Sequence, residues 1–224
     1  LFPEISKRAA ANDNDMIRTL TNDALSYAGL FLIPGIVGGT ILGDRLMRIY
    51  GDGFEIGALV LPILLVGILA YSYNKQLLNT LNGINRPDLA FRANAVFIVS
   101  NLVLNLFFVY SIGWIGAAIA TATSAGIGLV FGFYYTRRHV AFEIPFGEIA
   151  RQWSAALGMG VVVYSTRQLA EANWQWIVDY NAAFVVGLVG LGAAVYFVLL
   201  FGISKEFRTT VANNLPVDTP VIEK

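Results

Sequence analysis

Long stretches without a single charged side chain divide this sequence, and they constrain the fold more than any other feature. Residues 24–43, 56–74, 93–136 and 180–204 contain no Asp, Glu, Lys or Arg. A helix rises about 1.5 Å per residue, so about 20 apolar residues cross the hydrocarbon core of a membrane. Each stretch is therefore long enough for one crossing, and the longest is long enough for two.

A fifth uncharged stretch lies between Arg151 and Arg167, and its 15 residues fall below the usual length of a span. Both arginines can extend toward opposite membrane surfaces and lengthen the effective span. Ser111–Gly113 supplies a turn within the longest stretch. We therefore predict an all-α integral membrane protein, a bundle of about six transmembrane helices. The spans are expected at 24–43, 56–83, 93–110, 114–136, 151–168 and 180–203.

Composition agrees with this class and excludes several others. Of the residues, 56% are hydrophobic and only 13% are charged, against about 25% charged in soluble domains. The 15 basic and 15 acidic residues cancel, so no basic field suggests a nucleic-acid partner. The chain has no cysteine and one histidine, His139, which leaves no ligands for a thiolate or His-rich metal site. We predict neither a metal nor a cofactor.

The basic residues also predict an orientation. Six spans place twelve of the 15 Lys and Arg residues on the side that holds both chain ends, and only Arg45, Arg48 and Arg167 on the other. Cytoplasmic loops carry the excess of positive charge. We therefore expect the chain to lie in the cytoplasmic membrane, with both ends of this segment in the cytoplasm.

The regions that flank the bundle are predicted as follows. Residues 1–23 are expected to be the end of a preceding helix and a cytoplasmic lead-in, and residues 24–203 the six-helix lobe. The polar segment 204–224, with Pro216 and Pro220, is expected to be a disordered cytoplasmic tail. Pro34 and Pro62 fall inside the first two spans, where a kink is expected.

Small residues recur at every fourth position of two spans. One ridge is formed by Gly35, Gly39 and Gly43, and the other by Gly116, Ala120, Ser124, Gly128 and Gly132. Such ridges let helix backbones approach closely in lipid. They indicate either ordinary bundle packing or a sliding interface in a transporter, and we predict that the two ridges pack against each other.

Two groups of polar residues are candidates for substrate binding. Asn101 and Asn105 lie on one face near the middle of span 93–110, where amides avoid lipid. They form either a hydrogen-bonded clamp between helices or the polar wall of a substrate path. Lys75, Arg86 and Arg92 lie toward the predicted cytoplasmic side and either extend to the interface or contact an anionic headgroup.

Signs of catalysis are lacking in the sequence. No carboxylate lies deep in a predicted span, where a proton or sodium relay usually needs one. The Gly-x-Ser-x-Gly and His-Glu-x-x-His patterns do not occur. We therefore predict that the chain is not an enzyme.

Three short patches carry a resemblance to a known family. They are Leu1-Phe2-Pro3-Glu4-Ile5-Ser6, the segment from Gln76 to Pro87 with its Leu81-Asn82-Gly83-Ile84-Asn85-Arg86-Pro87 end, and Ile112-Gly113-Trp114-Ile115-Gly116-Ala117-Ala118-Ile119-Ala120-Thr121. In this order they resemble polysaccharide exporters of the multidrug/oligosaccharidyl-lipid/polysaccharide flippase superfamily.

The resemblance implies one lobe, the C-terminal one, of a two-lobe exporter of 12–14 spans. Such proteins move lipid-linked oligosaccharides across the cytoplasmic membrane by alternating access. The partners implied are membrane lipids, a polyprenyl-linked glycan and the missing N-terminal lobe. The alternatives are a drug exporter of the same superfamily, an intramembrane enzyme of polyprenyl metabolism, and a complete six-span structural protein.

Overall fold

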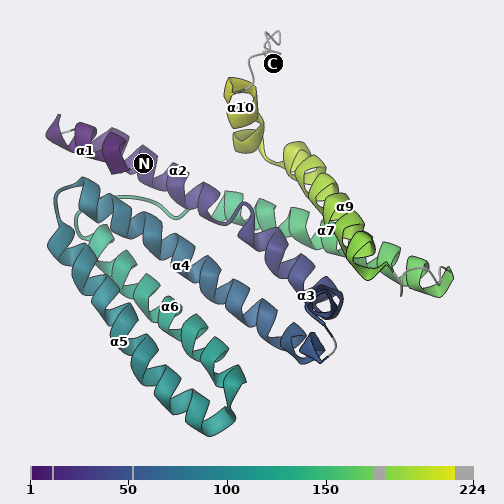
Figure 1. Ribbon diagram of the computed structural model, residues 1–224. Coiled ribbons are helices and arrows are strands. Elements are labelled where there is room, and N and C mark those ends of the chain that lie inside the picture. The colour runs from purple at the N-terminus through teal and green to yellow at the C-terminus, as the bar shows by residue number, and fades with distance from the viewer. Residues whose placement is uncertain (1, 12, 52, 174–179, 215–224) are drawn as a thin grey trace.

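The computed structural model describes residues 2–11, 13–51, 53–173 and 180–214, and in these ranges the chain is helical without a strand (Figure 1). The helices are α1 Phe2–Ala10, α2 Asn14–Ala28, α3 Leu32–Arg48, α4 Val60–Gly83, α5 Pro87–Ile112, α6 Trp114–Arg137, α7 Phe146–Asn173, α9 Asn181–Ile203 and α10 Lys205–Asn214, with a 3-10 turn, η1, at Phe54–Leu59. The predicted all-α class is confirmed.

Within the described part of the chain, five helical ranges are long and apolar enough to cross a membrane: Asn14–Arg48, Phe54–Gly83, Pro87–Ile112, Trp114–Arg137 and Asn181–Ile203. The remaining predicted span, 151–168, lies within α7, which is a helix of 28 residues. Its length suffices for a crossing, but it carries two acidic and two basic side chains, at Glu148, Arg151, Arg167 and Glu171. That α7 crosses the membrane stays a prediction.

Each proline inside the first two predicted spans lies in the first turn of a helix, just after an interruption of the span. Pro34 is the third residue of α3, and Pro62 is the third residue of α4. A first-turn N–H has no partner within its own helix, so proline is tolerated there. The first span is divided into α2 and α3 one turn before Pro34, and the second is preceded by η1. The disturbance expected at each proline therefore takes the form of a helix interruption just before it.

The predicted disordered tail is also helical in its first part. Lys205–Asn214 forms α10, which follows α9 after a single extended residue, Ser204. The Ser204 hydroxyl accepts a hydrogen bond from the backbone N–H of Phe207 at 2.9 Å and so caps the new helix. Residues 215–224 of the predicted tail lie outside the described residues.

The helices form two groups that share α4 and the break between α2 and α3. In one, α6 packs along α4 and α5, with α1 and α2 against α4; in the other, α3, α7 and α9 pack together (Figure 1). Buried side chains of α3, α7 and α9 form the largest apolar cluster, which includes Ile33, Ala156, Met159 and Leu200. The break at residues 29–31 therefore lies at the junction of the two groups.

The small-residue ridge of α6 is buried as expected, but its partner is different from the predicted one. A Cβ atom added at Gly128 would lie 3.0 Å from Cβ of Phe97 in α5, and one at Gly132 would collide with Asn74 in α4. The ridge of α3 faces elsewhere, because Gly39 packs on Leu65 of α4. The prediction that the two ridges pack against each other is wrong.

The three sequence patches that carry the family resemblance have a structural explanation. Gly83 is the last residue of α4, and Ile5 occupies the space that a side chain at position 83 would need. The first two patches therefore contact each other. Gly113, with φ of 70°, forms the turn between α5 and α6, a conformation that glycine adopts without penalty. Gly116 lies against the backbone carbonyl of Phe108, which leaves no room for a Cβ atom.

Candidate functional site

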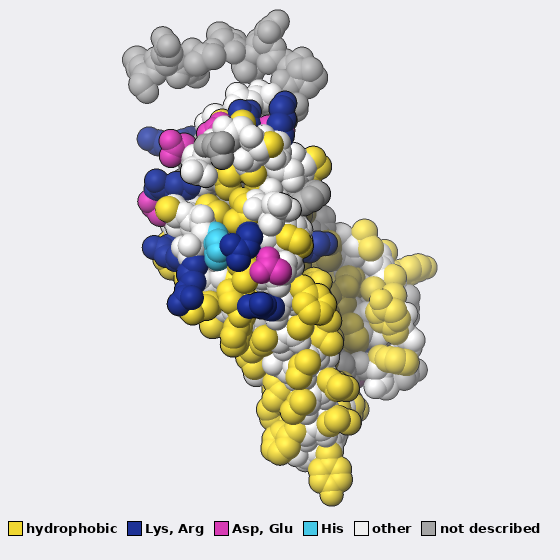
Figure 2. Space-filling view, turned by 90° about the vertical axis from the view of Figure 1, so that its left-hand side faces the viewer, with side chains coloured by type: hydrophobic (Ala, Val, Ile, Leu, Met, Phe, Trp, Pro, Cys, Tyr) yellow, Lys and Arg dark blue, Asp and Glu magenta, His cyan; other side chains and the backbone are white. Residues whose placement is uncertain are grey.

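Charged side chains gather at one end of the molecule. Figure 2 shows Lys and Arg side chains, with the histidine among them, over the upper part of one face and hydrophobic side chains over the lower part. The predicted basic group belongs to the connection of α4 and α5: Lys75 is in α4, Arg86 precedes α5, and Arg92 is in its second turn. Lys75 and Arg92 are exposed and make no ion pair among the described residues.

Arg86 is fixed by its neighbours. Its Nη1 donates a hydrogen bond to Nε2 of His139 at 3.0 Å, and its Nε pairs with Asp88 at 3.3 Å. Because Nε2 of His139 accepts, the ring proton is on Nδ1, which donates to the carbonyl of Tyr135 at 2.9 Å. The turn before α5 is thereby tied to the end of α6.

The two asparagines lie together in the contact between α5 and α6. Nδ2 of Asn101 donates to the hydroxyl of Ser124 at 3.0 Å, across the two helices. Nδ2 of Asn105 donates to Oδ1 of Asn101 at 3.2 Å and to its backbone carbonyl at 2.9 Å. This geometry is that of an interhelical clamp. In the described residues no hydrogen bond joins these amides to Lys75, Arg86 or Arg92, so a substrate role for the asparagines stays a prediction.

An ion cluster at the opposite end of the bundle was not predicted. Arg167 of α7 forms a bidentate pair with Asp44 of α3, at 2.8 and 2.7 Å, and bonds Glu171 at 2.7 Å. Arg45 adds an ion pair to Glu171 at 3.1 Å. The side chains of Arg45 and Arg167 are only 11% and 17% exposed. Two cations and two anions thus neutralise each other where α3 meets α7. The spacing Arg167–Glu171 on one helix face was the sequence signal for this cluster.

A buried carboxylate is a second feature that sequence reasoning missed. Glu148, in the first turn of α7, has a side chain that is 3% exposed. One of its oxygens accepts from the hydroxyl of Ser204 at 2.7 Å, and the other pairs with Arg151 at 3.0 Å. It escaped notice because the predicted span began three residues later, at Arg151.

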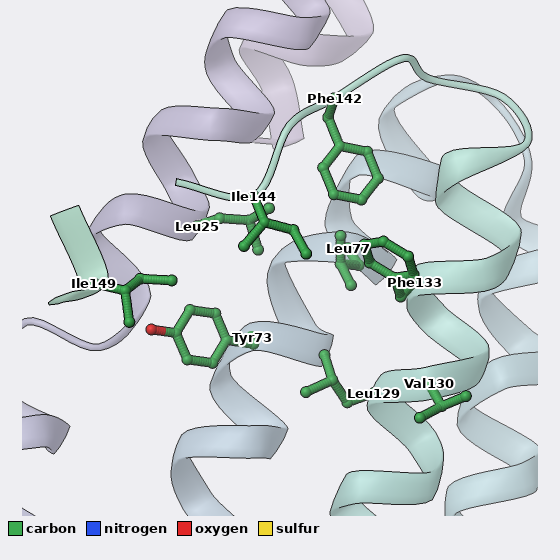
Figure 3. Close-up of a pocket in the computed structure, with 9 residues that line it drawn as sticks. All are labelled: Leu25, Tyr73, Leu77, Leu129, Val130, Phe133, Phe142, Ile144 and Ile149. Atoms are coloured by element: carbon green, nitrogen blue, oxygen red, sulfur yellow. The ribbon is translucent and has the colours of Figure 1, made fainter. Parts of the chain in front are cut away.

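Two apolar cavities lie within the bundle. One, of about 350 Å³, lies between α2, α4, α6 and the segment that joins α6 to α7 (Figure 3), and is lined by Leu25, Tyr73, Leu77, Leu129, Val130, Phe133, Phe142, Ile144 and Ile149. In Figure 3 the hydroxyl of Tyr73 points toward Ile149. The other, also of about 350 Å³, lies between α3, α4, α7 and α9. Both are lined almost wholly by apolar side chains and suit alkyl groups rather than sugars.

No group of three or more His, Asp or Glu residues that could hold a metal ion occurs among the described residues. The long apolar helices and the charged end together define a multi-pass membrane protein. Its fold is similar to that of a solved lipid II flippase MurJ in an inward closed conformation, with a TM-score of 0.72 at 20% sequence identity; the match covers 92% of this chain and 42% of that one.

Sequence comparison specifies the family. A probable flippase, AglR, of Haloferax volcanii is 30% identical over 94% of this chain and 43% of its own length. The probable low-salt glycan biosynthesis flippase Agl15 of the same organism is 29% identical over 77% of this chain and 37% of its own. The probable lipid II flippase MurJ of Vibrio cholerae is 31% identical over 49% of this chain and 21% of its own. The chain thus spans less than half the length of these relatives.

The family profile of the lipid II flippase MurJ matches residues 1–190, and the chain belongs to this family. The resemblance to flippases of lipid-linked glycans is therefore confirmed. Because the members of this family are transporters, the prediction that the chain is not an enzyme is confirmed as well.

Proposed function

We propose that the protein moves lipid-linked oligosaccharide or polysaccharide precursors across the cytoplasmic membrane by alternating access. The match of residues 1–190 to the flippase family is the observation that carries this proposal. The chain would supply the C-terminal lobe, with an N-terminal lobe of the same protein as its partner. Membrane lipid and a polyprenyl-linked glycan are the other partners in this proposal.

The charged end supports a cytoplasmic position for both ends of this segment. The connection of α4 and α5, the segment between α6 and α7, and α10 all lie in the upper part of Figure 1, whereas the α5–α6 turn and η1 lie in the lower part. The Lys and Arg excess lies at the upper end, which the positive-inside rule assigns to the cytoplasm.

In this proposal, the basic group binds the phosphate of the lipid-linked sugar as it leaves the inner leaflet. Lys75 and Arg92 are exposed and have no ion pair among the described residues, so their charges are available to a ligand. Arg86 is positioned by His139 and keeps further N–H donors. Asn101 and Asn105 lie further along α5, where they would meet sugar hydroxyls by exchanging the hydrogen bonds of the clamp.

Replacement of the basic group tests this function in the full-length transporter. A Lys75→Gln/Arg86→Gln/Arg92→Gln variant should lose roughly tenfold or more of its flipping rate in reconstituted vesicles, since each charge-assisted bond contributes about 1.5–3 kcal/mol. Asn101→Leu should slow flipping with less effect on binding of the headgroup.

The matched control removes three other cations of the same predicted side, in Lys7→Gln/Lys205→Gln/Arg208→Gln, and should flip at nearly the wild-type rate. If the first triple variant is inserted normally and also flips at the wild-type rate, Lys75, Arg86 and Arg92 serve topology alone.

A further inference from the structure

One face of α6 changes from apolar to basic toward the end of the helix. Leu129, Phe133 and Arg137 are spaced four residues apart, so they follow one another along this face. The first two line the apolar cavity of Figure 3, and the third is the last residue of the helix. About 12 Å of helix axis separates Leu129 from Arg137. An apolar stretch followed by a positive charge complements a phospholipid, in which an alkyl chain is followed by a phosphate.

The guanidinium of Arg137 lies at the edge of this cavity. Its Cζ is 5.8 Å from the ring centroid of Phe133 and 5.9 Å from that of Phe142, and both rings line the cavity. Its Nη1 donates to the carbonyl of Phe142 at 2.9 Å, which positions the side chain. In the part of the chain that the structure describes, no carboxylate pairs with Arg137, and the neighbouring Glu143 pairs with Arg18 instead. Because a guanidinium has five N–H donors, Arg137 keeps donors for an anion.

The cavity reaches the outer surface of the bundle. Val130, one of its lining residues, is 65% exposed, whereas Leu77 and Phe142 are each 1% exposed. In a membrane the outer surface of a helix bundle faces hydrocarbon, so an alkyl chain can enter from the side without crossing water. The volume of about 350 Å³ is at the lower end of the range for ligand pockets. It suits one alkyl chain of a phospholipid rather than a polyprenyl tail of many isoprene units.

We propose that this cavity binds one alkyl chain of an anionic membrane phospholipid, whose phosphate is bound by the guanidinium of Arg137. Charge-assisted hydrogen bonds from arginine to phosphate are strong, and basic sites between helices near the cytoplasmic surface bind lipid headgroups. The lipid contacts α2, α4, α6 and the segment before α7, since all of them line the cavity. It therefore stabilises their packing. The site goes beyond the proposed transport of lipid-linked glycans, because this lipid is a bound component of the bilayer and is not transported.

Thermal unfolding of the full-length protein in detergent, without substrate, tests the proposal. Dioleoylphosphatidylglycerol, which is anionic, is compared at equal concentration with dioleoylphosphatidylcholine, which has the same chains and no net charge. The anionic lipid should raise Tm by about 2–6 °C more than the zwitterionic one. Most of this difference should disappear in Arg137→Gln, which removes the phosphate ligand, and in Leu129→Trp, which fills the cavity. Arg137 is exposed, so Arg137→Gln tests the site even if Leu129→Trp does not fold.

Arg138→Gln is the matched control, because it removes the same charge one residue further along. The guanidinium of Arg138 lies 4.3 Å from the ring centroid of Tyr134, which does not line the cavity, so this variant should keep the difference. Equal Tm values in the two lipids would overturn the proposal. A difference that survives in Arg137→Gln or in a folded Leu129→Trp would place the lipid elsewhere and would also overturn it.

A third lipid separates this site from the path of the substrate. If polyprenyl phosphate raises Tm in an Arg137-dependent manner and dioleoylphosphatidylglycerol does not, the cavity belongs to the transported lipid and the proposal is overturned. Since flipping is not measured in these experiments, failure of this proposal leaves the proposed transport function as it stands.

Discussion

Single glycines of α6 decide how closely α4 can approach it. The amide of Asn74, which is fully buried, occupies the space in which a side chain of Gly132 would lie. Gly126, six residues earlier in the same helix, has no heavy atom within 4 Å of the position that a Cβ atom would take. The two glycines lie in the same helix but only Gly132 faces a neighbouring helix. Substituting each by alanine therefore separates the effect of packing from the effect of helix propensity.

Gly132→Ala should therefore lower the free energy of unfolding by about 1–3 kcal/mol, because the new methyl group must displace Asn74 from a packed interface. Gly126→Ala should leave it unchanged or raise it slightly, since alanine is the better helix former. Thermal unfolding of the two variants in detergent measures the difference. Equal destabilisation would show that α4 and α6 do not meet at Gly132.

At the scale of elements, α7 carries charged residues that find their partners on another helix. Arg167 and Glu171 belong to α7, and the ion cluster pairs them with Asp44 and Arg45 of α3. The cluster is partly buried, so removal of one member leaves a charge without its partner. The junction of α3 and α7 should thus be sensitive to a change in charge.

Arg167→Gln should reduce the free energy of unfolding by about 1–3 kcal/mol, the range for a hydrogen-bonded charge that loses its partner. A second substitution, Asp44→Asn, should restore part of the loss because it removes the isolated carboxylate. Arg48→Gln is the matched control, at the end of α3, the helix that contains Asp44. The side chains of its ion pair with Glu55 are 43% and 48% exposed, and such pairs contribute about 0–1 kcal/mol. If thermal unfolding shows that Arg48→Gln destabilises the protein as much as Arg167→Gln does, a structural role for the cluster is contradicted.

For the whole molecule, the predicted topology makes a simple labelling experiment possible. Cysteines at Tyr50, Ile112 and Asn173, all exposed, should react with impermeant thiol reagents from outside the cell, and one at Arg138 should not. This chain has no cysteine of its own to interfere. If only Arg138→Cys were labelled, the orientation would be the opposite of the predicted one.

The positions of the helices could be predicted from the sequence because each depends on a local property. Charge-free stretches of about 20 residues predict helices in a membrane, and Gly113 predicted the α5–α6 turn by its conformational freedom. Boundaries were less accurate where a proline acted: the first span is divided one turn before Pro34, the third residue of α3.

The contacts between helices could not be predicted in the same way. A ridge of small residues shows that some helix comes close but does not say which one, so the pairing of the α3 and α6 ridges was wrong. The hydrogen bond from Asn101 to Ser124 depends on the packing of α5 against α6, which the sequence did not specify. Likewise, the sequence gave no signal that Gln152 is buried. Its side chain donates to the carbonyl of Ser26, which is free to accept because the helix is interrupted after α2.

The pairing of Arg167 with Asp44 also sets an order of events in biosynthesis. During synthesis, α7 leaves the ribosome after α3 and is not among the five ranges that qualify as spans. A segment with arginine and glutamate enters lipid poorly by itself, whereas α3 can receive it with a charge of opposite sign. We therefore expect that insertion of α7 depends on α3. Asp44→Asn should increase the fraction of chains in which α7 fails to insert, which glycosylation mapping in microsomes can count.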